Sequence, residues 1–181
     1  MLAGMTRTQA ILARFDHAEY RLCRRFNRAS ALPVVLVTMR TASRLGDGAI
    51  WYALLVALPL VYGAGAWREV LAMAATGLAG LLAYKALKAT LVRERPFIRH
   101  PGIQLAMPPL DRYSFPSGHT LHAVCFSVQA CAHHPPLAWL LAPLASLIAL
   151  SRVVLGLHYP TDVAAGALIG VALAACGLAC T

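Results

Sequence analysis

Apolar residues form long runs along most of the chain, and short polar or proline-containing breaks separate these runs. The run 49–67 holds 19 residues without a charge, which is about the length of an α-helix that crosses the hydrocarbon core of a bilayer. Pro135, Pro136 and Pro160 fall in the breaks, where proline ends a helix because it lacks a backbone N–H. The pattern predicts five membrane-spanning helices, in the runs 49–67, 70–92, 120–132, 137–150 and 164–180.

The first 46 residues follow a different pattern, because they carry 8 of the 16 basic residues of the chain. Apolar side chains recur among these arginines loosely at helical spacing. A helix with one apolar and one basic face suits the surface of an anionic membrane. We therefore expect a basic amphipathic interfacial segment at 1–46 and a transmembrane domain at 47–181. The apolar positions of the predicted interfacial helix are Ile11, Leu12, Phe15, Tyr20, Leu22 and Phe26.

Composition agrees with a membrane protein. Only 13% of the residues are charged while 59% are apolar, and an ordinary soluble domain has about 25% charged residues. These values exclude a soluble globular domain, and they exclude a disordered chain because such chains are poor in apolar residues. The five cysteines have no paired spacing, so we expect neither a disulfide framework nor a zinc site. The predicted fold class is all-α, an integral-membrane bundle of about five transmembrane helices with an N-terminal amphipathic interfacial helix.

The excess of basic residues bears on the partners of the chain. Lys and Arg number 16 against 7 Asp and Glu, and the basic residues concentrate in the N-terminal segment. The simplest partner for this charge is an anionic lipid surface, so we expect a bilayer and no nucleic acid as the partner.

Polar residues at the ends of the predicted spans carry the candidate chemistry. A charge inside a span is costly and usually marks a site or a pathway. If consecutive spans form antiparallel hairpins, the end of the second, the start of the third, the end of the fourth and the start of the fifth meet at one membrane face. The residues at these four ends are Lys88, Arg95, Ser117, Gly118, His119, Arg152, His158 and Asp162.

Several of these residues have side chains or backbone N–H groups that can bind an anion. Lys88 and Arg95 are seven residues apart, or two helical turns, so both can close on one anion; the alternative is a snorkelling Lys beside an interfacial Arg. Arg152 presents a rigid fork that matches phosphate oxygens. Ser117 and Gly118 suit a helix start, whose free N–H groups bind anions, although an ordinary helix start has the same residues. Three neighbouring cations are expected to be plain interfacial charges: Lys85, Arg93 and Arg99.

Two histidines and one carboxylate complete the candidate site. His158 and Asp162 are four residues apart across Pro160, which favours the first position of a helix. The carboxylate can hold one ring nitrogen of His158 and leave the other free for attack; the alternative is that Asp162 only favours the helix dipole. His119 arrives from another segment. One histidine as nucleophile and one as acid, among cationic and N–H donors, predict phosphoryl transfer without a metal.

Three sequence motifs resemble those of the type 2 phosphatidic acid phosphatase superfamily. They are Lys88-x6-Arg95-Pro96, Pro116-Ser117-Gly118-His119 and Ser151-Arg152-x5-His158-x3-Asp162, and the resemblance covers about residues 46–181. It implies a helical bundle with the site at one membrane surface. It also implies that His158 attacks phosphorus to form a phosphohistidine, that Asp162 orients His158, and that His119 protonates the leaving oxygen. The phosphoryl oxygens would be held by Lys88, Arg95, Ser117, the N–H of Gly118 and Arg152.

The expected function is that of an integral-membrane lipid phosphatase. Its substrate would be a lipid phosphomonoester or a terminal lipid diphosphate, with undecaprenyl diphosphate as the first choice. Phosphatidylglycerophosphate or phosphatidate phosphatase and a lipid phosphotransferase stay open as alternatives. Vanadium haloperoxidases share the three motifs, but the membrane spans argue against them. A non-catalytic anion or lipid transporter would use Lys88 and Arg152, yet it gives no reason for the pairing of His158 with Asp162.

Metal and topology complete the expectations. Because Lys88, Arg95 and Arg152 supply positive charge and the sequence has no carboxylate cluster for Mg²⁺, we expect neither metal nor cofactor. Five spans place the N-terminus and the site on one face, which the positive-inside rule would make cytoplasmic. The resemblance favours a periplasmic site in the bacterial cytoplasmic (inner) membrane, and this is the topology that we expect.

Overall fold

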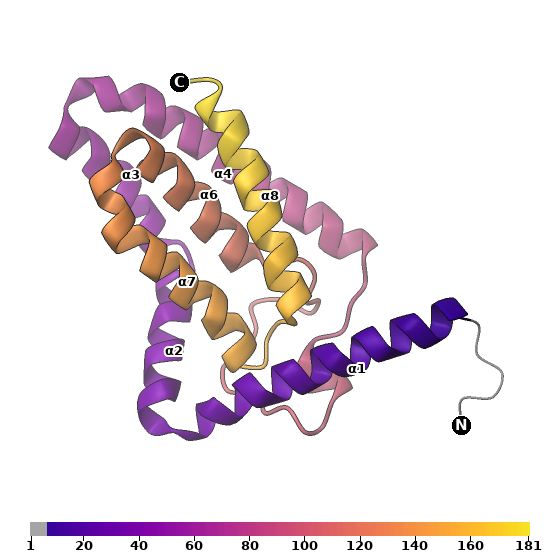
Figure 1. Cartoon of the computed structure of the whole chain (residues 1–181). Coiled ribbons are helices and arrows are strands. Elements are labelled where there is room, and N and C mark those ends of the chain that lie inside the picture. The colour runs from indigo at the N-terminus through magenta and orange to yellow at the C-terminus, as the bar shows by residue number, and fades with distance from the viewer. Residues whose placement is uncertain (1–6) are drawn as a thin grey trace.

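The computed structural model of the protein describes residues 7–181, with side chains from residue 16 onward. All regular elements within this range are helical (Figure 1). The α-helices are α1 (Arg7–Asn27), α2 (Pro33–Leu45), α3 (Ala49–Tyr62), α4 (Trp67–Thr90), α5 (Pro96–Arg99), α6 (Gly118–His133), α7 (Ala138–Val154) and α8 (Pro160–Leu178). Short 3-10 turns precede α2, α4 and α7, at Arg28–Ala31, Ala64–Ala66 and Pro135–Leu137. The all-helical class is confirmed for these residues.

Three helices of the described chain are long and apolar enough to cross a membrane. They are Ala64–Thr90, Pro135–Val154 and Pro160–Leu178. A fourth span is obtained if α2 and α3 count together, although they are bent by 56° at the break between them. The integral-membrane prediction is thus supported by three to four candidate spans, and the count of five stays a prediction.

The run 49–67 is not one continuous helix. It is broken after Tyr62 by Gly63, whose φ of 83° lies in the region that glycine adopts most easily. The chain then turns through Ala64–Ala66 into α4. Apolar character alone could not place this break, because Ala and Gly count as apolar residues whether they continue a helix or end it.

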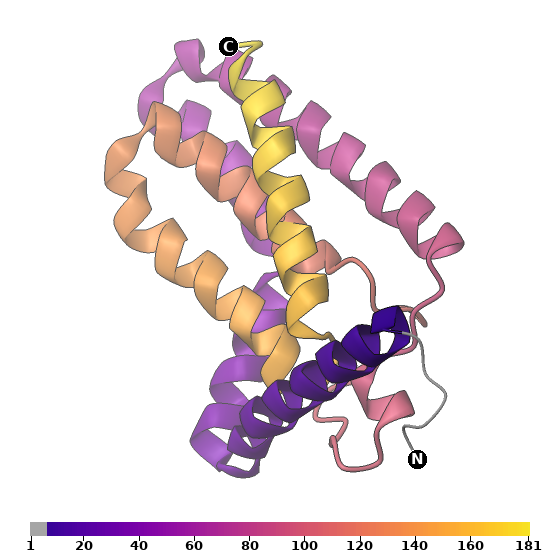
Figure 2. The same cartoon turned by 45° about the vertical axis from the view of Figure 1, so that its right-hand side comes forward.

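The helix α6 lies at the centre of the bundle and packs against α4, α7 and, most extensively, α8 (Figures 1 and 2). Close approach to α8 depends on glycine. A Cβ atom at Gly166 would lie 2.5 Å from the carbonyl oxygen of Ser117, and one at Gly170 would lie 2.6 Å from that of Leu121. Small residues of this kind let helix backbones approach in lipid. The packing brings the start of α8 beside the start of α6.

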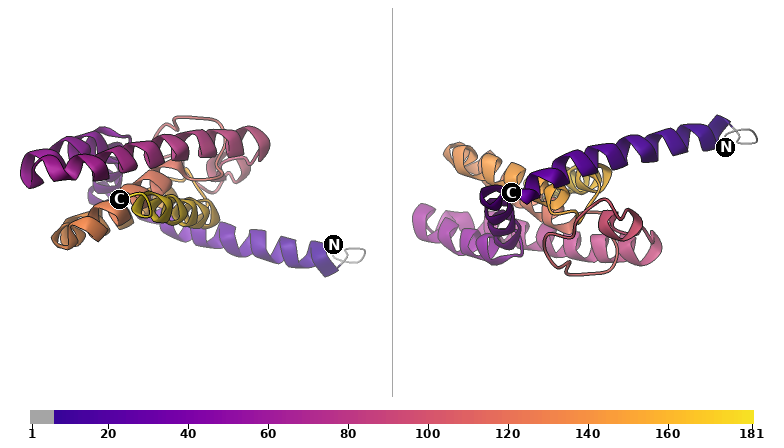
Figure 3. Two further views of the ribbon diagram at one scale, coloured as in Figure 1. Left: turned by 90° about the horizontal axis from the view of Figure 1, so that it is seen from above. Right: turned by 90° about the horizontal axis from the view of Figure 1, so that it is seen from below.

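The helix α1 crosses the end of the bundle at which α6 and α8 begin, and its N-terminal part extends beyond the bundle (Figures 1 and 3). Leu22 and Phe26 of its predicted apolar face are exposed, while Ile11, Leu12 and Phe15 lie outside the described side chains. Their contact with a membrane surface stays a prediction. The buried face of α1 instead consists of Cys23 between two polar residues, Glu19 and Asn27.

The segment 91–117, which contains α5, folds over the same end of the bundle. The side-chain amide of Asn27 donates to the carbonyl oxygens of Gln104, at 2.9 Å, and Val154, at 3.0 Å. The backbone N–H of Gln104 donates in return to Oδ1 of Asn27, at 2.8 Å. These bonds tie α1, the segment 91–117 and the end of α7 together.

Candidate active site

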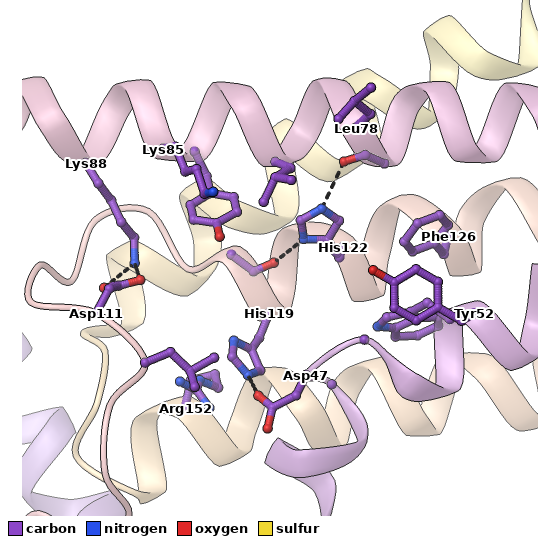
Figure 4. Close-up of a pocket in the computed structure, with 18 of the residues that line it drawn as sticks. Asp47, Tyr52, Leu78, Lys85, Lys88, Asp111, His119, His122, Phe126 and Arg152 are labelled. Atoms are coloured by element: carbon purple, nitrogen blue, oxygen red, sulfur yellow. Dashed lines mark hydrogen bonds and ion pairs between the residues drawn. The ribbon is translucent and has the colours of Figure 1, made fainter.

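Most of the predicted site residues line one cavity of about 640 Å³ at this end of the bundle (Figure 4). They reach it from the end of α4, the segment 91–117, the start of α6, the end of α7 and the turn before α8. Ser117 and Asp162 are fully buried and lie behind the cavity wall. The predicted residues that line the cavity are Lys88, Arg95, Gly118, His119, Arg152 and His158.

Lys88 and Arg95 converge on one anionic group, the carboxylate of Asp111. Figure 4 shows the pairing of Lys88 with Asp111. Nζ of Lys88 lies 2.8 Å from Oδ1 and 2.7 Å from Oδ2, and Nη2 of Arg95 lies 2.8 Å from Oδ1. Arg95 is 1% exposed, and its Nη1 also donates to the carbonyl oxygen of Leu157, at 2.7 Å. The two cations therefore meet at one anion, but helical spacing does not bring them together, because α4 ends at Thr90 and Arg95 lies in the loop beyond it.

Asp111 was not predicted from the sequence. It belongs to no motif, and its partners are 23 and 16 residues away along the chain. Burial raises the pKa of its carboxyl group, but the ion pairs with Lys88 and Arg95 outweigh burial and hold that pKa below its ordinary value. Asp111 is therefore an anion at neutral pH.

Arg152 and His119 each contact α2 or the turn that follows it. Arg152 is 2% exposed, and its Nη1 donates to the hydroxyl of Ser43. Nε2 of His119 lies 2.5 Å from Oδ1 of Asp47 (Figure 4). Asp47 therefore orients the ring that is predicted to act as the acid. Neither Ser43 nor Asp47 could be found from sequence, because their partners are 109 and 72 residues away.

His158 and Asp162 lie together and α8 begins at Pro160, as predicted, but no hydrogen bond joins the Asp162 carboxylate to Nδ1 of His158. Nδ1 of His158 is 3.6 Å from Oδ2 of Asp162, and Nε2 is 3.4 Å from Nη1 of Arg95. Asp162 also has the alternative role of a carboxylate at the start of α8, because Oδ2 accepts the backbone N–H of Tyr159 at 2.8 Å. Burial first, and then the charges of Arg152 and Arg95, hold the pKa of His158 well below its usual range. Its imidazole is therefore neutral and has a free electron pair at neutral pH.

The predicted helix start at Ser117 and Gly118 is present, but the two residues face different surroundings. The hydroxyl of Ser117 pairs with that of Thr120, at 3.0 Å, and its backbone N–H donates to the carbonyl oxygen of Asp162, also at 3.0 Å. A Cβ atom at Gly118 would lie 3.4 Å from the ring of Tyr84. Gly118 thus reaches the cavity, whereas the hydroxyl of Ser117 is turned toward α6.

The interpretation of Arg93 as an interfacial charge is wrong. Its Nη1 lies 2.6 Å from Oδ1 of the buried Asp162, and its Nη2 lies 2.5 Å from Oε2 of Glu19 on α1. Neither residue lines the cavity. Arg93 contacts the Asp162 carboxylate that faces His158, and Glu19 contacts Arg93 from behind.

The cavity continues from the cations into an apolar region between α3, α4 and α6 (Figure 4). Its shape suits a ligand with an anionic end and an apolar body. The apolar and aromatic residues of this region include Trp51, Tyr52, Leu55, Leu78, Leu81 and Phe126. Within the described part of the chain, no three His, Cys, Asp or Glu side chains are placed to hold a metal ion together.

Comparisons with known proteins agree with the three motifs. The family model of the PAP2 superfamily matches residues 65–181. Decaprenylphosphoryl-5-phosphoribose phosphatase of Mycolicibacterium smegmatis is 38% identical over 136 residues, which are 74% of this chain and 72% of that protein. Undecaprenyl-diphosphatase BcrC of Bacillus subtilis is 31% identical over 121 residues, 66% of this chain and 62% of that protein. The crystal structure of Aquifex aeolicus LpxE superposes with a TM-score of 0.77 at 27% identity, covering 88% of this chain and 93% of that one.

Proposed function

Because the chain belongs to the PAP2 superfamily, we propose that it is an integral-membrane phosphatase that removes the terminal phosphate of a polyprenyl-linked lipid. Undecaprenyl diphosphate is the first candidate. Two relatives support the polyprenyl class, since one is named for a decaprenylphosphoryl substrate and the other for undecaprenyl diphosphate. The apolar part of the cavity gives the lipid chain a place beside the cations.

The observation that carries this proposal is the meeting of Lys88 and Arg95 at one carboxylate. Asp111 is an internal anion that both cations reach at 2.7–2.8 Å. A substrate phosphoryl group is larger and more highly charged, and it would bind at this position by displacing the Asp111 carboxylate. Arg152 and the N–H of Gly118 border the same cavity and bind the other phosphoryl oxygens. Ser117 joins them once its hydroxyl turns from Thr120.

The reaction then has two steps. Nε2 of the neutral His158 attacks phosphorus, the bond from phosphorus to the leaving oxygen breaks, and His119 gives that oxygen its proton. The product of this step is a phosphohistidine. His119 next takes a proton from water, the water oxygen attacks phosphorus, and the bond to Nε2 breaks to release phosphate. Asp162 stabilises the positive charge that His158 gains in the first step.

Positive charge for both steps comes from the side chains themselves. Lys88, Arg95 and Arg152 neutralise the charge that develops on the phosphoryl oxygens, which is the task that Mg²⁺ performs in other phosphoryl transfers. We expect phosphate release to persist in excess EDTA. Complete loss of activity that added Mg²⁺ restores would contradict the metal-free site.

The test is phosphate release by the purified full-length chain in detergent. The panel contains undecaprenyl diphosphate, decaprenylphosphoryl-5-phosphoribose, phosphatidylglycerophosphate and phosphatidate, each with the wild type and with His158→Ala. We expect the highest kcat/KM on a polyprenyl substrate and near-background activity for His158→Ala. A radiolabelled phosphoryl group should be trapped on the wild type by rapid denaturation.

Other results separate the alternatives. Highest kcat/KM on a glycerophospholipid would overturn the polyprenyl class. Transfer of the label to a second lipid instead of water would identify a phosphotransferase. Binding of a lipid phosphate without any phosphate release would favour the transporter.

A further inference from the structure

The buried face of α1 is directed at the candidate site. Glu19, Cys23 and Asn27 are spaced by four residues, so they lie on one face of the helix. Each contacts a segment that carries the site: Glu19 reaches the start of α8, Sγ of Cys23 lies 3.9 Å from the carbonyl oxygen of His158, and Asn27 bonds to Gln104 and Val154. In Figure 1, α1 passes directly beside the start of α8. A purely lipid-bound helix would have no need for this polar face.

Glu19 stabilises the first turn of α8. The residue is 6% exposed, and its Oε1 accepts both the backbone N–H of Thr161, at 3.1 Å, and the Thr161 hydroxyl. The first N–H groups of a helix have no partner within the helix, and a negative charge there also interacts favourably with the helix dipole. Glu19 therefore supplies the first turn of α8, which contains Asp162, with an acceptor from another helix.

Arg93 connects Glu19 to Asp162. Its planar guanidinium donates to one oxygen of each carboxylate, at 2.5 Å and 2.6 Å, and it lies 4.0 Å from the ring centroid of Tyr159. Burial would lower the pKa of Arg93, but the two carboxylates outweigh burial and raise that pKa above its ordinary value. With Oδ1 of Asp162 held by Arg93, Oδ2 is the oxygen that faces Nδ1 of His158.

We propose that Glu19 and Arg93 are positioning residues that hold the Asp162 carboxylate in the orientation that serves His158. The inference rests on the proposed function, because it concerns the attack by His158. When Nε2 of His158 bonds to phosphorus, Nδ1 carries the proton and the ring becomes positive. That charge is stabilised only if Oδ2 of Asp162 stays beside Nδ1. The helix α1 is thus part of the working enzyme, in addition to any contact it makes with the membrane.

The inference predicts a particular kinetic signature. Because neither Glu19 nor Arg93 lines the cavity, their loss should lower kcat and leave KM nearly unchanged. In metal sites, removal of a residue that orients a ligand from behind costs roughly tenfold to a hundredfold in activity, and we expect the same range here. We expect a fall of this size for Glu19→Gln, which removes the charge and replaces one of the two acceptor oxygens that bind Thr161 and Arg93 with an NH₂ group. We expect a similar fall for Arg93→Lys, which keeps the charge but cannot bridge two carboxylates.

Asn27→Ala is the matched control. Asn27 is 4% exposed and ties α1 to the same loops, but it does not contact Asp162 or Arg93. This variant should lower the thermal unfolding temperature in detergent while kcat stays close to that of the wild type. Glu19→Gln in the Arg93→Lys background should add little to the loss in kcat, because both changes release the same carboxylate.

The outcomes distinguish this inference from the proposed function. Phosphate release by the wild type together with unchanged kcat in Glu19→Gln and Arg93→Lys would overturn the inference alone. An equal fall of kcat in Asn27→Ala would also overturn it, since docking of α1 would then be the cause. If the wild type released no phosphate from any lipid of the panel, the proposed function would fail and this inference with it.

Discussion

Asp111 occupies the position between Lys88 and Arg95 at which a substrate phosphoryl group is proposed to bind. In the resting protein its carboxylate forms the ion pairs of two buried cations, Lys88 and Arg95, and buried charges without an opposite charge are strongly destabilising. During binding the same carboxylate competes with the phosphoryl group for both cations. Asp111 therefore stabilises the empty site and weakens the binding of anions to it.

Asp111→Asn should consequently bind anions more tightly. The neutral amide competes less well for Lys88 and Arg95, so we expect the inhibition constant of inorganic phosphate to fall by about tenfold, equivalent to ~1.4 kcal/mol. The measurement is competitive inhibition of phosphate release. Glu94→Gln is the control, because it removes an exposed acid from the same segment. Weaker inhibition of Asp111→Asn than of the wild type would contradict this role.

The neutral state of His158 predicts the acidic side of the pH profile. Burial and the neighbouring cations lower its pKa well below 6.5, so the attacking imidazole stays unprotonated at mildly acidic pH. Because His119 must carry a proton in the first step, a plot of kcat/KM against pH should be bell-shaped. Each limb then reports an apparent pKa of the interacting groups together and not of one ring alone. We expect the acidic limb below pH 6.5, after correction for ionisation of the substrate.

The same shift affects stability with a defined sign. The unfolded chain binds the proton of His158 more readily than the folded chain, so the free energy of unfolding should fall as the pH drops below about 6.5. His17→Gln is a control for both measurements, because His17 is exposed on α1. An acidic limb well above pH 6.5 that persists in this control would show that His158 is charged in the free enzyme.

At the scale of elements, the apolar runs predicted α4, α7 and α8, and their lengths are close to those observed. The same runs could not predict the break at Gly63 or the bend between α2 and α3, because backbone conformation at glycine does not change apolar character. The division of the chain at residue 46 stays a prediction.

In the candidate site, contacts between residues that are close in sequence could be predicted, and contacts between distant residues could not. The four-residue spacing predicted that His158 lies beside Asp162. The helical spacing of Lys88 and Arg95 does not explain why they meet at Asp111, because α4 ends at Thr90. The roles of Glu19 and Arg93 were missed because their contacts are distant in sequence; Glu19 contacts Thr161 from 142 residues away. An acidic residue in a basic helix, where its ordinary partners are the arginines around it, gives no sign of its tertiary partner. Local patterns thus indicate which ends of the helices meet, and folding determines which polar residues hold them.

Packing of α8 on α6 should be essential to the site. At Gly166 a Cβ atom would lie 2.5 Å from the carbonyl oxygen of Ser117, so Gly166→Ala must push apart the helices that carry Asp162 and His119. Overpacking of this kind costs about 1–3 kcal/mol. We expect a lower thermal unfolding temperature in detergent and a lower kcat.

Gly65→Ala is the matched control for this change. A Cβ atom at Gly65 has no neighbour within 4 Å, so the added methyl group meets open space. This variant should unfold at the wild-type temperature and keep the wild-type kcat. Equal stability of Gly166→Ala and Gly65→Ala would mean that the two helices can separate slightly without cost.

At the scale of the whole molecule, the charge distribution and the family resemblance favour opposite topologies. The site end carries the segment 91–117 and α1, whereas Arg68 lies at the start of α4, at the other end of the bundle. Counting charges alone would place the site end in the cytoplasm. Yet Lys88, Arg93 and Arg95 are paired with carboxylates inside the protein. They are not free loop charges of the kind that the rule counts, which leaves a periplasmic site compatible with the sequence.

Labelling of single cysteines tests this topology. In a chain whose five native cysteines are replaced by Ala or Ser, Arg99→Cys places a thiol at the site end, on a side chain that is 51% exposed in the wild type. Gly65→Cys places one at the opposite end, in the open turn before α4. If the site faces the periplasm of the inner membrane, a membrane-impermeant thiol reagent should label Arg99→Cys in intact cells and Gly65→Cys only after the membrane is opened. The reverse pattern would place the site in the cytoplasm, and the paired cations would then obey the charge rule after all.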